Sequence, residues 1–366
     1  MSNQNDSAFN NGSKYGIDRR KFLAAGATAI AAPAVFTGPA RAAGQVIVRT
    51  SGGAYADAIT PTIYDPFTKE TGIEVVQVAA TIGKLFAMFR SGNVELDVID
   101  TDQVVLLGLQ REGALAPIDY ASWKRVDPNE IDAAVRLPHF AGHLYFSWVM
   151  TYSKEAFPDG KQPKSWAEFW DTKRFPGART LPDLASGQPP LEFALLADGV
   201  SIDKLYPLDI DRAFKALDRL RPSVRKFWDT GALSAELFTS KEVVLGALWN
   251  ARAQPAIDAG LPIGLEWNES MYTCMGYSIF KGAKNAENAQ KLVEFASQPK
   301  YLAEFLSRYP YGPASQSTLK LMSPEALSRL PTTPERRAKA FALDTVWWED
   351  NRKAVNDRWA RWQLGR

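Results

Sequence analysis

Residues 243–264 read VVLGALWNARAQPAIDAGLPIG, and this stretch decides the fold. It opens with an apolar run of strand length that ends at Trp249 and Asn250. A helical segment follows over residues 251–259 and stops at Gly260, with Pro262 just beyond it. Open α/β sheets present groups to a ligand in this way, at the carboxyl end of a strand where a helix begins. We therefore expect an α/β protein with an aromatic ring and an amide at a strand tip.

The same stretch resembles the extracellular solute-binding proteins of ABC importers, in the branch that includes the spermidine/putrescine-binding proteins. That branch carries a G-x-x-W-N strand tip and then a short helix that ends x-A-G-x-P-I, which match residues 246–250 and 258–263. Residues 67–75 and the pattern S-W-A-x-x-W at residues 165–170 resemble the family as well. The resemblance implies a type II periplasmic-binding-protein fold, in which two α/β lobes are joined by a hinge with a ligand cleft between them. It also implies a small-molecule solute as cargo, ABC permease subunits in the inner membrane as partners, and a separate ATPase chain.

Residues 1–43 are expected to be an export signal. The run Asp18-Arg-Arg-Lys-Phe-Leu23 resembles a twin-arginine motif, and an Ala-rich apolar region follows over residues 22–36. This region is too short and too broken by Gly26 and Pro33 for a transmembrane helix. A small-x-small site predicts cleavage near Ala42 and a periplasmic mature protein. Residues 1–42 carry five basic and two acidic residues, so their removal changes the formal net charge from +2 to −1.

The expected elements form two lobes. We predict lobe one from residues 44–144 with 277–318, and lobe two from residues 145–276 with 319–366, whose Trp-rich tail folds back onto lobe two. Expected strands cover residues 45–50, 96–100, 144–153, 177–182, 243–248 and 277–280, and a further one ends at residues 227–228. Expected helices cover residues 55–67, made imperfect by two prolines, then 191–196 and 211–220, and one that Asn285 caps and that buries Ala289, Leu292, Val293 and Ala296.

Candidate ligand contacts lie at expected strand tips and rigid turns. In lobe one, Ser51, Gly52 and Gly53 form a turn whose backbone amides can meet a ligand directly, although a plain strand–helix turn explains them equally well. Tyr55 follows on the next helix. The further candidates, which rest on the resemblance or on their place at a strand end or turn, are Asp102, Gln103, Trp228, Trp249, Asn250, Met275, Tyr309 and Tyr311. Aromatic walls suit an alkyl chain or an organic cation.

The sequence also departs from the polyamine-binding members of the family that it resembles. In polyamine-binding members, carboxylates clamp the amino groups, and the matching positions here are Met275 and the neighbourhood of Ser186 and Pro189. A buried polycation without matching charges would be strongly destabilised by desolvation. We therefore expect a polyamine-like or other amine or zwitterion with a single positive charge, or a neutral solute, and only weak binding of spermidine. Ferric iron, held by paired tyrosines such as Tyr309 and Tyr311, is the alternative ligand.

The sequence contains few catalytic patterns. His139 and His143 lack the glutamate of a zinc-protease motif, Cys274 has no evident histidine base, and neither a nucleophile elbow nor a dinucleotide or Walker motif is present. We therefore expect no enzymatic activity, no cofactor and no metal, with an exported periplasmic enzyme as the rival class. Basic residues are dispersed, which argues against nucleic acid. The protein is expected to be a monomer.

Overall fold

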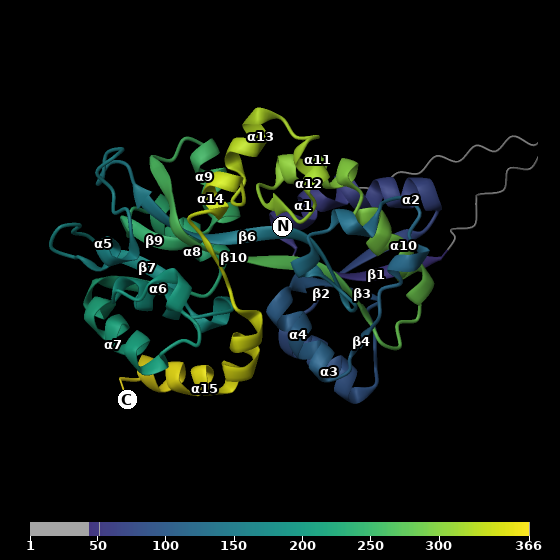
Figure 1. Ribbon diagram of the computed structural model, residues 1–366, viewed down its shortest axis with the longest axis horizontal. Helices are drawn as coiled ribbons and strands as arrows, with labels where there is room; N and C mark the ends of the chain where they lie inside the picture. The colour runs from purple at the N-terminus through teal and green to yellow at the C-terminus, as the bar shows by residue number, and fades with distance from the viewer. Residues whose placement is uncertain (1–43, 51, 366) are drawn as a thin grey trace, which may run out of the picture. The chain divides into compact units, whose positions relative to one another are not determined.

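A twelve-stranded sheet organises the chain in the computed structural model, which describes residues 44–50 and 52–365 (Figure 1). Its main order is β2-β1-β3-β10-β6-β9-β7-β8, and short strands pair with its two central members. The strands are β1 (Gln45–Thr50), β2 (Glu74–Ala79), β3 (Val98–Asp102), β4 (Leu115–Ala116), β5 (Arg136–Leu137), β6 (Phe140–Ser153), β7 (Arg179–Pro182), β8 (Val224–Trp228), β9 (Leu245–Trp249), β10 (Ile263–Phe280), β11 (Gly312–Pro313) and β12 (Phe341–Ala342).

The two long strands β6 and β10 divide the sheet into two lobes. On one side of the pair, β1 runs parallel to β2 and β3, and β3 pairs antiparallel with β10 through Met275 and Asp102. On the other side, β7 runs parallel to β8 and β9, and β9 pairs antiparallel with β6 through Trp249 and Trp148. Because β6 and β10 pair with each other, and β10 pairs with β3 while β6 pairs with β9, they are the segments that cross between the two sides of the sheet.

Helices flank the strands of each lobe (Figure 1). They are α1 (Gly53–Ile59), the π-helix η1 (Thr60–Tyr64), α2 (Asp65–Thr71), α3 (Ile82–Ser91), α4 (Gln103–Arg111), α5 (Trp166–Trp170), α6 (Leu191–Ala197), α7 (Ile210–Leu220), α8 (Gly231–Thr239), α9 (Asn250–Asp258), α10 (Ala286–Ala296), α11 (Pro299–Arg308), α12 (Gln316–Leu319), α13 (Pro324–Arg329), α14 (Pro334–Arg337) and α15 (Thr345–Gln363). Single 3-10 turns are η2 (Tyr120–Ser122), η3 (Pro128–Glu130), η4 (Ala133–Val135), η5 (Leu184–Ser186), η6 (Ile202–Lys204) and η7 (Arg221–Ser223). Within the described ranges, none of the helices has both the length and the apolar character needed to cross a membrane.

Helix α10 shows how the apolar spacing builds the core. The predicted stripe of residues 289, 292, 293 and 296 is fully buried, as a period of 3.6 residues requires for one face of a helix. Asn285 occupies the N-cap position of this helix, as predicted, but its side chain makes no capping hydrogen bond. Its amide instead donates a hydrogen bond of 2.9 Å to Asp97, whose two carboxylate oxygens also accept from the backbone of Ile47 and Asn285. Asp97 therefore ties β1 to the start of α10.

The C-terminal helix α15 contacts both lobes. Against lobe one, Asp350 forms an ion pair of 2.6 Å with Arg111 at the end of α4. Against lobe two, the buried Trp362 donates a hydrogen bond of 2.6 Å to Asp218 of α7. The Trp348 indole donates to Glu192 of α6 at 2.6 Å. In Figure 1, α15 (yellow) runs from beside α4 to the helices of lobe two, so it is a third connection between the lobes.

Cys274, the one cysteine of the sequence, lies buried on β10. Burial, with a smaller contribution from Asp132, raises the pKa of its thiol well above the usual value. The thiol is therefore protonated at neutral pH, which makes it a poor nucleophile.

Candidate functional site

The carboxyl ends of the parallel strands in both lobes meet at one pocket. Its volume is about 340 Å³. Lobe one contributes Arg49, Tyr55, Ile82, Thr101, Asp102, Tyr309 and Tyr311, the crossover strand β10 contributes Met275, and lobe two contributes Ala185, Ser186, Gly187, Gln188, Asp229, Thr230, Gly231, Trp249 and Arg252. The crossover strand β6 adds Phe146 and Trp148. Ligands of open α/β sheets bind in this position, outside the carboxyl ends of the strands. This pocket is called the cleft pocket below.

The structure places the predicted ligand contacts in two groups. Those that line the cleft pocket are Tyr55, Asp102, Trp249, Met275, Tyr309 and Tyr311. Those that do not are Gly52, Gly53, Gln103, Trp228 and Asn250. Ser51 lies outside the described residues. Gly52 and Gly53 begin α1, and Gln103 begins α4 and faces a small hollow beside α15.

Trp228 and Asn250 lie behind the pocket wall and hold it in place. Trp228 is fully buried and donates a hydrogen bond of 2.9 Å to the backbone oxygen of Ala247. The Asn250 amide oxygen accepts from the backbone nitrogen of Ser147 at 3.1 Å, and its nitrogen donates to the backbone oxygen of Pro310. Asn250 therefore joins the tip of β9 to β6 and to the turn that carries the two predicted tyrosines.

Aromatic rings form one wall of the cleft pocket. Trp249 packs edge to face against Trp148 and Trp228, with ring centroids 6.2 and 5.1 Å apart. Tyr309 and Tyr311 also meet edge to face, at 4.9 Å. Such pairs fix the orientation of each ring beyond what apolar burial requires. The wall is thus a rigid surface for the apolar part of a ligand.

Two arginines and two aspartates line the same pocket. Arg49 donates a hydrogen bond of 2.7 Å to the backbone oxygen of Asp100. Arg252 differs, because its buried Nε atom has no hydrogen-bond partner within residues 44–50 and 52–365. A buried donor without a partner is costly, so an unsatisfied one at a pocket indicates a missing acceptor. The lining therefore holds two positive and two negative side chains, and the buried Nε of one of the cations has no acceptor among the described residues.

Asp102 has a structural role as well as a place in the pocket. One carboxylate oxygen caps α4 by accepting hydrogen bonds from Val104 and Val105 at 3.0 and 3.2 Å. Burial raises the pKa of Asp102, and the two capping bonds partly oppose that shift. Asp229, the other acid of the lining, is exposed at the start of the segment that leads into α8.

A buried polar network supports the lobe-one wall. The Tyr55 hydroxyl donates to Asp100, and the other Asp100 oxygen lies 3.1 Å from Nε2 of His143. The His143 ring stacks on Tyr277 at 4.3 Å. Burial, followed by the Asp100 charge, raises the pKa of Tyr55 well above its usual value. Tyr55 therefore lines the pocket as a neutral phenol, and its hydroxyl already donates a hydrogen bond to Asp100.

The paired tyrosines are poorly prepared to bind iron. Burial raises the pKa of Tyr309 and that of Tyr311, which opposes the phenolate form that coordinates a metal. Residues 44–50 and 52–365 hold no group of three or more His, Cys, Asp and Glu side chains arranged to bind a metal ion. The iron alternative thus gains no support from the geometry.

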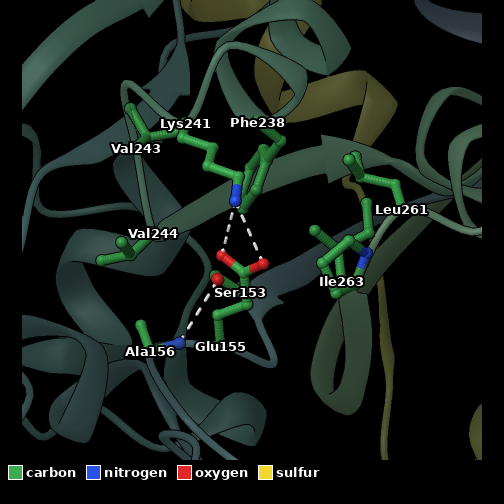
Figure 2. Close-up of a pocket in the computed structure, with 10 residues that line it drawn as sticks. Ser153, Glu155, Ala156, Phe238, Lys241, Val243, Val244, Leu261 and Ile263 are labelled. Carbon is green, nitrogen blue, oxygen red and sulfur yellow. Dashed lines mark hydrogen bonds and ion pairs between the residues drawn. The ribbon is translucent and has the colours of Figure 1, made fainter.

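A second hollow, of about 250 Å³, lies at the outer end of β6 and β10 and shares no lining residue with the cleft pocket (Figure 2). Figure 2 shows Lys241 reaching Glu155 there, with Nζ to carboxylate distances of 3.1 and 2.9 Å. Phe238, Val243, Leu261 and Ile263 complete much of its lining. Its two charged groups satisfy each other, so this hollow has no free charge to offer a solute.

Much of the charged lining was not predicted from the sequence, namely Arg49, Asp229 and Arg252. A weak signal existed for Arg252, which follows the predicted strand tip by only three residues. Phe146 and Trp148 were placed on an expected strand but were not recognised as lining. Their role depends on pairing between β6 and β9, which are about a hundred residues apart in the chain.

The sequence and the fold are similar to those of known proteins of one class. Residues 62–334 match the family model of the bacterial extracellular solute-binding proteins. The chain is 32% identical to the gamma-aminobutyric acid-binding protein of Pseudomonas aeruginosa, over 89% of this chain and 93% of that one. It is 27% identical to the spermidine/putrescine-binding periplasmic protein of Escherichia coli, over 74% of this chain and 79% of that one. The crystal structure of an ABC transporter substrate-binding protein from Bradyrhizobium japonicum superposes with a TM-score of 0.81 at 33% identity, covering 87% of this chain and 99% of that one.

These likenesses confirm the expected fold and the expected class. The periplasmic-binding-protein fold is shared with a solved ABC substrate-binding protein across nearly its whole length. The family binds solutes and is not enzymatic, so the rival reading as an exported enzyme is set aside. The chain therefore belongs to the bacterial extracellular solute-binding protein family and serves an ABC transporter.

Proposed function

We propose that this protein captures a zwitterionic solute with an amino group, an alkyl spacer and a carboxylate, in the manner of gamma-aminobutyric acid. The observation that carries the proposal is Arg252, whose buried Nε has no partner and which lines a pocket with charges of both signs. A guanidinium binds a carboxylate through two parallel hydrogen bonds, which fits a carboxylate at this position. The 32% identity to a gamma-aminobutyric acid-binding protein supports the same class.

The amino end of such a solute would meet Asp102 or Asp229 and the aromatic wall. A cation over an aromatic ring gains about 0.5–2 kcal/mol, and the alkyl spacer gains from apolar burial against the same rings. A polyamine fits less well. Its several positive charges would share the pocket with Arg49 and Arg252, and the uncharged Met275 stands where the resemblance to the polyamine-binding branch implies a carboxylate.

Isothermal titration of the purified mature protein tests the proposal. The panel consists of gamma-aminobutyric acid, its homologues of shorter and longer spacer, its carboxamide analogue, putrescine and spermidine. We expect gamma-aminobutyric acid or a homologue of different spacer length to bind tightest. The carboxamide should bind about tenfold or more weakly, because it loses a charge-assisted hydrogen bond. The proposal would be overturned if spermidine binds tightly and no amino acid in the panel gives a measurable heat of binding.

Two arginine variants make that experiment specific. Arg252→Gln should weaken amino-acid binding by about 10- to 100-fold, as expected for the loss of a bond between charged groups. Arg225→Gln is the matched control, because Arg225 lies exposed on β8, pairs with Glu242 at 3.0 Å and is not part of the cleft pocket. Equal loss in both variants would show that Arg252 has no specific role.

The transport context is part of the same proposal. The solute would be delivered to permease subunits in the inner membrane that are powered by a separate ATPase chain. The lobes would be residues 44–144 with 277–318 and residues 145–276 with 319–366. This division is supported by the two crossovers and by the contact of Trp362 with α7. A bacterium that lacks this gene should lose uptake of the radiolabelled solute and regain it only with the intact gene.

Export would depend on the twin-arginine signal, with cleavage near Ala42. These residues lie outside those that the structure describes, so the support is the motif itself. Replacing Arg19 and Arg20 with lysine should retain the full-length precursor in the cytoplasm, since this pathway reads the arginine pair. Fractionation with an antibody measures the outcome. Normal export of the lysine variant would point to a different route.

A further inference from the structure

Gly231, the first residue of α8, lies directly against the side chain of Arg252. A Cβ atom built on Gly231 would lie 2.6 Å from the Arg252 Nε, 2.9 Å from its Cγ and 3.0 Å from its Cδ. Real side chains do not approach so closely, so any larger residue at position 231 would force the arginine to move. Both residues line the cleft pocket.

The backbone gives no other reason for glycine at this position. The φ angle of Gly231 is outside the left-handed region that disfavours other residues, unlike that of Gly187, which lines the same pocket from the loop between β7 and α6. Alanine also favours a helix more than glycine does. The space that the missing Cβ leaves, and the arginine stem that fills it, therefore account for the glycine.

We propose that Gly231 is a positioning residue, which sets where the Arg252 guanidinium meets the carboxylate of the solute and thereby selects for solutes that carry one. This inference rests on the proposed function of the same pocket. Arg252 lies on α9, directly after the tip of β9, whereas Gly231 lies just after β8. Two separate strand–helix junctions thus cooperate to place one charged group.

The effect of a substitution follows from the flexibility of arginine. The side chain can rotate away from a new methyl group, so the fold loses little. The guanidinium then leaves the place where the carboxylate would meet it. Bidentate recognition depends on geometry, so a displacement of about 1 Å is enough to weaken it. A solute without a carboxylate makes no such bond and is affected much less.

Titration of Gly231→Ala with gamma-aminobutyric acid and with its carboxamide analogue tests the inference. We expect affinity for the amino acid to fall at least about tenfold and affinity for the carboxamide to change less than about threefold. Gly83→Ala is the matched control. That glycine lies near the pocket in α3, has nothing within 4 Å of an added Cβ, and has no positive φ. It should leave both affinities unchanged.

A double-mutant cycle separates positioning from general damage. In an Arg252→Ala background, Gly231→Ala should cause no further loss of amino-acid affinity, because the displaced group is absent. The melting temperature of the ligand-free protein should match that of the wild type. Equal loss for both solutes, or a loss that persists without Arg252, would overturn the role of Gly231. If the wild-type protein binds none of the carboxylate-bearing amines, the proposed function fails as well. The titration of the wild type alone shows this outcome, so it is distinguished from an effect of Gly231→Ala.

Discussion

At the scale of single residues, Trp249 is held from three sides before any solute arrives. Trp148, Trp228 and Phe146 meet it edge to face, with ring centroids between 5.1 and 6.3 Å apart. Its ring is therefore pre-oriented, and a ligand that stacks on it need not bear the entropy of ordering it. The fixed aromatic wall and the unsatisfied Arg252 suit opposite ends of one small molecule.

Trp249→Ala should weaken solute binding by about 1–3 kcal/mol, through lost burial and lost cation–ring attraction. Titration calorimetry measures the change. Trp249→Phe keeps a ring in place and should retain most of the affinity, which controls for disturbance of the neighbouring tryptophans. Unchanged affinity in the alanine variant would remove Trp249 from the binding site.

The Asp102→Asn variant removes a negative charge from the lobe-one side of the pocket and keeps the shape of the side chain. Asparagine also caps helices well, so α4 should remain intact. If Asp102 receives the amino group of the solute, affinity should fall by about tenfold or more, since a charge-assisted bond is lost. Asp209→Asn is the control, because Asp209 caps α7 by the same type of bond, at 3.0 Å, away from the pocket. Unchanged affinity of Asp102→Asn, or an equal loss in the control, would contradict the assignment.

At the scale of elements, Glu192 attaches α15 to the core of lobe two. Its carboxylate is fully buried and accepts hydrogen bonds of 2.6 Å from Tyr206 and from Trp348 at the start of α15. The other carboxylate oxygen has no partner. Burial raises the pKa of Glu192, and the two hydrogen bonds only partly oppose that shift. The attachment is therefore sensitive to pH.

The direction of that sensitivity can be predicted. The folded protein keeps the Glu192 proton to higher pH than the unfolded chain, whose carboxyl titrates near 4.5. Between the unfolded and the folded pKa the native state binds more protons, so this group lowers the free energy of unfolding as pH rises through that window. Glu192→Gln should remove this dependence of the free energy of unfolding on pH. The stability of the variant relative to the wild type should therefore be higher at neutral pH than in acid. Urea unfolding of both proteins at several pH values, compared as differences, measures the effect, and parallel pH profiles would refute it.

The elements differ in how far the sequence determines them. The buried stripe of α10 and the strand before Trp249 follow from local spacing, so they could be predicted. The prolines at positions 61 and 66 predicted an imperfect helix, and the chain forms the π-helix η1 between α1 and α2. Strand β10 was recognised only at its end, because the polar segment around Asn268 and Glu269 breaks the alternation. The pairing of β10 with the distant β6 is interrupted at the same segment, after Glu266, and resumes at Met271.

The site was harder to predict than the fold for the same reason. Aromatic residues at strand tips are visible as local patterns, and several of them line the cleft pocket. Arg252, by contrast, looks like a solvated side chain on a short helix until Gly231 is placed beside it by the parallel pairing of β7 with both β8 and β9. A contact between two strand ends leaves no periodic trace in one sequence.

At the scale of the whole molecule, three connections link the lobes on either side of the pocket. Strands β6 and β10 cross between them, and α15 contacts α4 on one side and α7 on the other. A solute that touches both lobes favours the closed arrangement by the difference between its affinities for the closed and open forms. The Arg111–Asp350 pair of α15 is exposed, so it contributes little to holding either form.

Small-angle scattering should show a smaller radius of gyration when gamma-aminobutyric acid, or the tightest solute of the panel, saturates the protein. The Arg252→Gln variant, measured at a solute concentration below its own dissociation constant, should keep the larger radius. Calorimetry on the same samples confirms occupancy. A wild-type radius that stays constant at full occupancy would argue against closure.

The buried Cys274 has a practical consequence. Its thiol is protonated and shielded within β10, and the sequence contains no other cysteine. A maleimide dye therefore has no native target in the folded protein, so a cysteine introduced at the surface can be labelled alone without first removing any residue. Ile82, which is 39% exposed at the rim of the cleft pocket, is a suitable place. An environment-sensitive fluorophore attached at Ile82→Cys would turn the protein into an optical sensor whose emission follows solute concentration.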